Sequence, residues 1–160
     1  LLIGQALFDA ISLAASASPR RRRNRNFHAN DAAPAHRLLN AIEPDSYLPP
    51  YRHLDPNQDE TMVCVSGRLG LVFFDDQGQV RQTAVLAAAG TVCGVNIPCG
   101  LYHTVLALDP GTVMLEAKAG PSTCRCLKTN APHGHPAKMS RQPQPMRSRC
   151  ASALPTTRCA

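Results

Sequence analysis

The sequence contains no tryptophan, and aromatic residues make up only 4% of its 160 residues. Aliphatic side chains must therefore supply the hydrophobic core, and they are frequent enough for one ordinary domain with tails. No stretch reaches the roughly 18 consecutive apolar residues of a membrane-spanning helix. Asp9 interrupts the apolar N-terminal stretch and no basic residues precede it, which favours an amphipathic helix over a signal peptide. We therefore predict no membrane span.

Acidic residues are absent from residues 121–160, which carry seven Lys and Arg. Residues 1–120 carry ten Lys and Arg against eleven Asp and Glu, and five of those ten cations lie between residues 20 and 25. The net charge of +6 therefore comes from the C-terminal tail, whereas residues 26–120 are acidic. An acidic body argues against a nucleic-acid-binding face, so we predict no nucleic-acid partner.

A disulfide framework has little support, because the seven cysteines are an odd number and four of them lie in the tail. The other three, Cys64, Cys93 and Cys99, lie in or beside apolar runs, where cysteine usually packs as a small hydrophobic residue. We interpret them as reduced thiols and predict a cytoplasmic protein.

Residues 1–45 predict short helices and a basic connector that pack on the rest of the domain. Ile3, Leu7, Ile11 and Ala14 recur at helical spacing and form one apolar face. Residues 36–42 predict a second short helix, which ends just before a proline. The arginine-rich run between them is expected to be a solvated connector or, alternatively, a place where arginine side chains bind an anionic ligand.

Residues 46–120 change to short strands separated by turn residues. Because no helical stretch intervenes, this pattern predicts an antiparallel sandwich or barrel with an interior that can hold a ligand. Residues 121–160 have a biased composition without a regular period and are predicted to be disordered. The predicted strands cover residues 47–53, 60–66, 69–74, 79–86, 91–97, 101–108 and 112–117.

Two groups of residues in the predicted barrel carry metal-ligand chemistry. Tyr51 and His53 are two positions apart and share one face if they lie on a strand, and a turn rich in Asp and Asn leads from them to Glu60. The second group, at residues 98–103, is a Pro-x-Gly turn that leads to His103 on an apolar strand. Each group alone is a weak signal, but together they indicate a metal site.

These residues resemble the two motifs of the cupin superfamily. Its first motif has two histidines separated by one residue, then a glutamate and a glycine, and Tyr51, His53, Glu60 and Gly67 fall on it. Its second motif, Pro-x-Gly-x-x-His, ends here at His103. The resemblance implies an all-β cupin fold, that is, a double-stranded β-helix or jelly-roll barrel.

Within that superfamily the chain looks most like the WbuC-type cupin-fold metalloproteins. These are associated with surface-polysaccharide (O-antigen) gene clusters, so the resemblance implies a metal-binding protein of sugar metabolism or lipopolysaccharide biosynthesis. It does not define a reaction. The matching residues are 18–20, 23–28, 37–41, 44–47, 74–78 and 116–121.

The first departure from the family pattern is Tyr51, which stands where the first histidine is expected. A phenol with a pKa of about 10 is mostly protonated at neutral pH and is a poor metal ligand. The implied ligand set for one divalent ion is then His53, Glu60 and His103, a composition with open positions that suits Fe, Zn, Mn or Ni. The open position can admit water or substrate, or the lost ligand can leave a site too weak to hold the ion.

The second departure is the acid-free tail, because the resemblance ends at Pro121. The family continues with a segment that contains aromatic and acidic residues. We hypothesise that a reading-frame change in the source gene produced residues 121–160.

Three functions remain open. The leading one is a metal-binding cupin that acts in, or regulates, sugar metabolism for surface polysaccharide, with no defined reaction. If it is an enzyme of this kind, Glu60 or Tyr102 would move a proton in a metal-dependent sugar isomerisation or epimerisation. The rival enzyme is an Fe(II)-dependent dioxygenase. The third is a non-catalytic sugar- or anion-binding module in which Arg23, Asn26 and His28 hold an anionic group. We expect a small-molecule partner such as a sugar or nucleotide sugar, and a homodimer.

Overall fold

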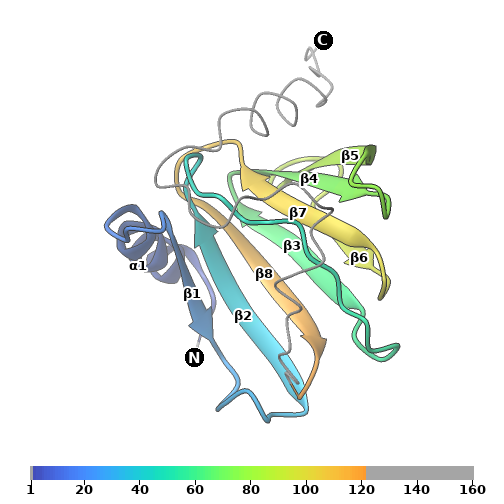
Figure 1. Cartoon of the computed structure of the whole chain (residues 1–160). Helices are drawn as coiled ribbons and strands as arrows, with labels where there is room; N and C mark the ends of the chain where they lie inside the picture. The colour runs from blue at the N-terminus through green and yellow to red at the C-terminus, as the bar shows by residue number, and fades with distance from the viewer. Residues whose placement is uncertain (1, 122–160) are drawn as a thin grey trace.

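A computed structural model describes residues 2–121, and within that part it contains one helix followed by eight strands (Figure 1). In chain order these are α1 (Gln5–Ser16), β1 (Arg22–Asn26), β2 (Ala35–Ile42), β3 (Glu60–Ser66), β4 (Arg68–Phe74), β5 (Val80–Ala87), β6 (Gly94–Ile97), β7 (Tyr102–Ala107) and β8 (Thr112–Ala119). The strands form two antiparallel sheets, with the orders β1-β2-β8-β3-β6 and β5-β4-β7. The predicted all-β fold is confirmed. The tail predicted to be disordered lies, from residue 122 on, outside the described residues.

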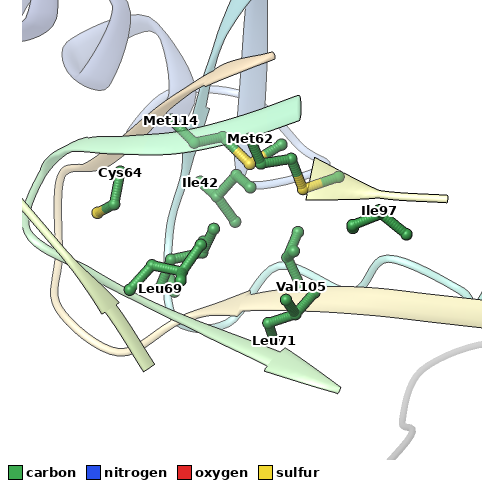
Figure 2. Close-up of a cluster of buried hydrophobic side chains, with 10 residues drawn as sticks. Ile42, Met62, Cys64, Leu69, Leu71, Ile97, Val105 and Met114 are labelled. Atoms are coloured by element: carbon green, nitrogen blue, oxygen red, sulfur yellow. The ribbon is translucent and has the colours of Figure 1, made fainter. Parts of the chain in front are cut away.

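The hydrophobic core lies between the two sheets and uses alternate residues of each strand, as strand periodicity requires. Even-numbered residues of β2, β3 and β8 face this interior, and odd-numbered residues of β4 and β7 face it from the other sheet. Figure 2 shows these aliphatic and sulfur-containing side chains converging, which fits the low aromatic content. The buried residues of this cluster are Ile42, Met62, Cys64, Leu69, Leu71, Leu86, Ile97, Val105, Ala107 and Met114.

Helix α1 covers the outer face of the larger sheet. Ile11 and Ala15 of the helix are buried against Leu39 and Ala41 of β2 and Val113 of β8. A helix of this length is marginal alone in water, so the packing of its apolar face is what stabilises it. The amphipathic helix predicted at the N-terminus is therefore confirmed.

The helix predicted for residues 36–42 is wrong, because these residues belong to strand β2. Both faces of β2 are covered. Leu38 and Ile42 face the barrel interior, and Leu39 and Ala41 face α1. A strand buried on both faces reads as a nearly continuous apolar run, which periodicity alone does not distinguish from a buried helix.

Two further expectations also differ from the structure. Part of the basic run forms strand β1, which is the edge of the larger sheet among residues 2–121, and charged side chains suit a sheet edge. Residues 47–53 do not form a strand and instead meet β7 at one isolated bridge, Tyr51 with His103. The prolines at positions 49 and 50 carry no N–H group, so they cannot extend that pairing into a ladder. The other six predicted strands are present with small shifts at their ends.

The described residues also show how the cysteines are placed. Cys64, Cys93 and Cys99 are free thiols, and Cys64 packs in the core as predicted. Burial raises the pKa of the Cys64 thiol, which keeps it neutral. Within residues 2–121, no helix has both the length and the apolar character to cross a membrane.

Gly67, in the tight turn between β3 and β4, provides a test of this packing. Its φ is +71°, and a Cβ atom placed there would lie 2.6 Å from Thr112 Oγ1. Gly111 has nearly the same backbone angle, +69°, but a Cβ atom there would meet nothing closer than 3.8 Å. The two glycines therefore separate backbone strain from steric overlap.

We expect Gly111→Ala to lower the free energy of unfolding by about 1–2 kcal/mol, the strain of a left-handed residue with a Cβ atom. Gly67→Ala should lower it by about 1–3 kcal/mol more, because overlap with Thr112 is added. Urea denaturation of both variants measures the difference. Equal losses would show that Thr112 moves aside without penalty.

Candidate functional site

The candidate site is built around Glu60, the first residue of β3. Its side chain points into the barrel and is fully buried. In the sheet register Glu60 lies opposite Lys118 of β8 on one side and Ile97 of β6 on the other. A carboxylate in this position needs hydrogen bonds or opposite charge to replace the water it has lost.

His103 of β7 contacts Glu60 from the facing sheet. Its Nε2 atom lies 3.0 Å from Glu60 Oε2, and its Nδ1 atom lies 2.9 Å from the carbonyl oxygen of Leu101. The carbonyl oxygen can only accept a hydrogen bond, so Nδ1 carries the donor proton. This bond orients the ring so that Nε2 points at Glu60, and a metal-ligating histidine is fixed in the same way by a bond from its other ring nitrogen.

Tyr51 and His53 approach the same carboxylate oxygen from the segment before β3. The Tyr51 hydroxyl donates to Glu60 Oε2 at 3.1 Å, and His53 Nε2 lies 3.5 Å from that oxygen. Backbone bonds fix this segment, since the N–H groups of Tyr51 and His103 each donate to the other's carbonyl and Gly100 N–H donates to His53 O. The two sequence motifs are thus held together by their main chains.

Lys118, which the sequence analysis did not single out, completes the cluster. Its Nζ atom lies 3.3 Å from Glu60 Oε1, 3.4 Å from His53 Nε2 and 2.7 Å from Glu116 Oε1. Asn40 of β2 donates to the other oxygen of Glu116 at 2.8 Å. The sequence signal was the presence of two charged residues at alternate positions of an apolar strand, because such positions share one face.

Burial and charge together set the protonation of this cluster. Burial raises the pKa of Glu60, but hydrogen bonds from His103 and His53 and the charge of Lys118 outweigh it, so the pKa is lowered. Burial and the neighbouring Glu60 raise the pKa of Glu116 to about 7. Burial lowers the pKa of Lys118, but attraction to Glu116 and Glu60 outweighs it and raises the pKa. Near neutral pH, Glu60 and Lys118 are therefore charged, and Glu116 is partly protonated.

The structure does not bring Tyr102 to this cluster. Its neighbour His103 faces the interior, so strand alternation turns Tyr102 to the other face of β7. There its ring packs beside Val72 and Phe74, and the Arg52 guanidinium lies 4.2 Å from the ring centroid.

The three residues of the predicted anion site are also separated. Arg23 is paired with Ala41 on the face that α1 covers, whereas Asn26 is paired with Leu38 on the interior face. His28 lies beyond the end of β1, where Nδ1 contacts the backbone of Arg37. Asn26, rather than Arg23, therefore shares a face with the cluster around Glu60.

The expected ligands are of the types that a divalent ion prefers, and one of their spacings matches adjacent positions on such an ion. Ligand atoms at adjacent positions of an octahedral ion, each about 2.1 Å from it, lie about 3 Å apart. The Nε2 atoms of His103 and His53 lie 3.0 Å and 3.5 Å from Glu60 Oε2. Even so, no three His, Cys, Asp or Glu side chains of residues 2–121 already surround a common ion position. Here these groups bond directly to one another and to Lys118.

Known structures share this fold. CapF, solved with the inhibitor 3-isopropenyl-tropolone, aligns with 64% of this chain and 29% of its own length at 16% identity and a TM-score of 0.52. A conserved protein of unknown function from Streptococcus pyogenes aligns with 65% of this chain and 78% of its own at 12% identity and a TM-score of 0.50. A cupin-2 domain protein from Shewanella frigidimarina aligns with 61% and 80% at 19% identity and a TM-score of 0.46. Identities this low bear on the fold alone.

The chain folds as two facing antiparallel sheets, the all-β arrangement expected from the two motifs. Residues 3–86, just over half of the sequence, match the family described as "Domain of unknown function (DUF6016)", and the chain belongs to that family. No curated protein matches the sequence.

The raised pKa of Glu116 gives a pH-dependent stability that can be measured. Because the pKa is about 7 in the folded state and 4.5 in the unfolded reference, this group stabilises the fold fully below about pH 4.5 and loses that contribution as pH rises through 7. Glu60 acts in the opposite sense only below its ordinary range, because its pKa is lowered. Of these two carboxyl groups, only Glu116 therefore changes the free energy of unfolding between pH 5 and 8.

We expect Glu116→Gln to make the free energy of unfolding less dependent on pH, removing a fall of about 1–3 kcal/mol between pH 5 and 8. Denaturant unfolding of both proteins with chelator present measures this fall, because the two proteins differ only at residue 116. Parallel curves for the two proteins would contradict the assignment.

Proposed function

We propose that this chain is a WbuC-type metal-binding cupin of sugar or surface-polysaccharide metabolism. One divalent ion, Fe, Zn, Mn or Ni, would be held by His53, Glu60 and His103. The convergence of two imidazole Nε2 atoms on one buried carboxylate oxygen carries this proposal. The bond from His103 Nδ1 to Leu101 supports it, because it aims the other ring nitrogen inward.

Such an ion, when bound, supplies Lewis acidity toward a carbonyl or hydroxyl oxygen of a substrate. The chain's own residues provide proton transfer. Glu60 and Tyr102 are the candidates from the sequence, and Glu116 joins them because its pKa of about 7 suits exchange near neutral pH. Of these, Glu116 and Glu60 lie in the same buried cluster.

A polyhydroxylated ligand is supported by the polar groups beside the cluster. Asn24 and Asn26 of β1 share the interior face with Asn40, and Asn24 Nδ2 donates to Asn26 Oδ1 at 3.0 Å. Asn24 and Asn26 are exposed to solvent, whereas Glu116 is buried. Amide groups both donate and accept hydrogen bonds, which suits sugar hydroxyls. The resemblance over residues 18–121 to proteins of O-antigen gene clusters points to the same class.

Titration of chelator-treated protein with Fe(II), Mn(II), Ni(II) and Zn(II) tests the metal site. We expect binding of one ion, and His103→Ala should weaken it by more than about 100-fold because a direct ligand is lost. His28→Ala is the matched control, because it removes a histidine outside the cluster and should leave affinity unchanged. Failure of all four ions to bind would reject the metal site.

Replacing Tyr51 tests its place in the site separately. The Tyr51 hydroxyl touches Glu60, so Tyr51→His should add a ligand and tighten binding by about tenfold or more. Calorimetric titration of this variant beside the unaltered protein measures the change. Unchanged affinity would mean that position 51 lies too far from the ion to contribute.

The second candidate is a non-catalytic sugar- or anion-binding module, and the ion pair between Lys118 and Glu60 favours it because the carboxylate already has a cation. Native mass spectrometry with sugars and nucleotide sugars distinguishes this module from a metal-dependent protein. Binding that persists in chelator without turnover supports the module. Oxygen consumption that requires Fe(II) would instead identify the dioxygenase.

A further inference from the structure

The ammonium group of Lys118 lies among the atoms that would hold the ion. It is 3.3 Å from Glu60 Oε1 and 3.4 Å from His53 Nε2, both of which belong to proposed ligands. A divalent ion bound to these residues would lie within a few ångströms of the ammonium. Two cations at such a distance repel strongly where water is excluded.

Lys118 is also held in place from its far side. Glu116 accepts a bond from it at 2.7 Å and is fixed in turn by Asn40 at 2.8 Å. The Lys118 side chain is only 18% exposed. The chain of contacts from Asn40 through Glu116 and Lys118 to Glu60 links β2, β8 and β3, so Lys118 is part of the built interior.

We propose that Lys118 is the resident cation of this centre, so a divalent ion binds to His53, Glu60 and His103 only when the Lys118 ammonium leaves Glu60 and His53. The identity of the metal ligands rests on the proposed function, whereas the position of the Lys118 ammonium beside Glu60 and His53 does not depend on it. The flexible four-carbon side chain of lysine allows such a movement without a change in the sheet. Lys118 thereby sets the affinity of the site for a divalent ion.

The test is calorimetric titration of the full chain with Zn²⁺ and Mn²⁺. Lys118→Met removes the ammonium but keeps an unbranched side chain of similar length, and affinity should rise by at least about tenfold because the competing charge is gone. Lys118→Arg keeps a cation and should show no gain. Arg68→Met removes the exposed cation paired with Asp109, far from the cluster in the fold, and should leave affinity unchanged.

The outcomes separate this inference from the proposed function. If only Lys118→Met binds an ion, Lys118 is the resident cation and the natural protein is not a metalloprotein. If Lys118→Met and the unaltered protein bind the ion equally tightly, the metal site stands and the role of Lys118 is overturned. If neither binds, both proposals fail.

Lys118→Gln serves as a second variant if Lys118→Met does not fold, because glutamine still donates a hydrogen bond to the carboxylates. In the unaltered protein, acylation of the Lys118 amine quantified by mass spectrometry gives an independent measurement. Bound Zn²⁺ should increase labelling at least about twofold, because a displaced amine is more accessible. Labelling that does not change when Zn²⁺ is bound would also overturn the proposal.

Discussion

The buried carboxylate of Glu60 is the group on which the interior of this barrel depends. It has lost its water, and its hydration is replaced by the Tyr51 hydroxyl, the His103 ring and the Lys118 ammonium. These partners come from three separate parts of the chain, namely the segment before β3, strand β7 and strand β8. Their convergence joins the two sheets through polar contacts where the hydrophobic core ends.

The interior is therefore divided into an apolar part and a polar part. Met62, Met114 and Val105 fill the apolar part, and each lies two positions along its strand from a charged or polar residue of the cluster. Within residues 2–121, every buried side-chain nitrogen or oxygen has a hydrogen-bond partner. Complete pairing of this kind gives a polar cluster a single arrangement, since partly satisfied clusters are unstable.

Local patterns predicted much of this architecture. Turn residues and alternation located six of the eight strands. Motif spacing identified His53, Glu60 and His103, and in the structure the Nε2 atoms of both histidines lie within 3.5 Å of Glu60 Oε2. These signals are local because turn chemistry and strand periodicity act over a few residues.

Other features depend on which strands become neighbours. Lys118 reaches Glu60 only because β8 pairs with β3, and Asn40 reaches Glu116 only because β8 also pairs with β2. The pattern of residues 36–42 predicts a helix because a strand covered by α1 on one face and by the core on the other has no polar face to reveal its period. Pairings this distant in sequence leave no local pattern.

The central position of β8 has a kinetic consequence. It pairs with β2 and β3, and Asn40 and Glu116 are 76 residues apart in the chain. Contacts between residues so distant close large loops and slow folding. During synthesis β2 remains without its main partner until β8 emerges, with apolar residues on both of its faces. The larger sheet therefore assembles late, and its nascent form is the stage most exposed to aggregation.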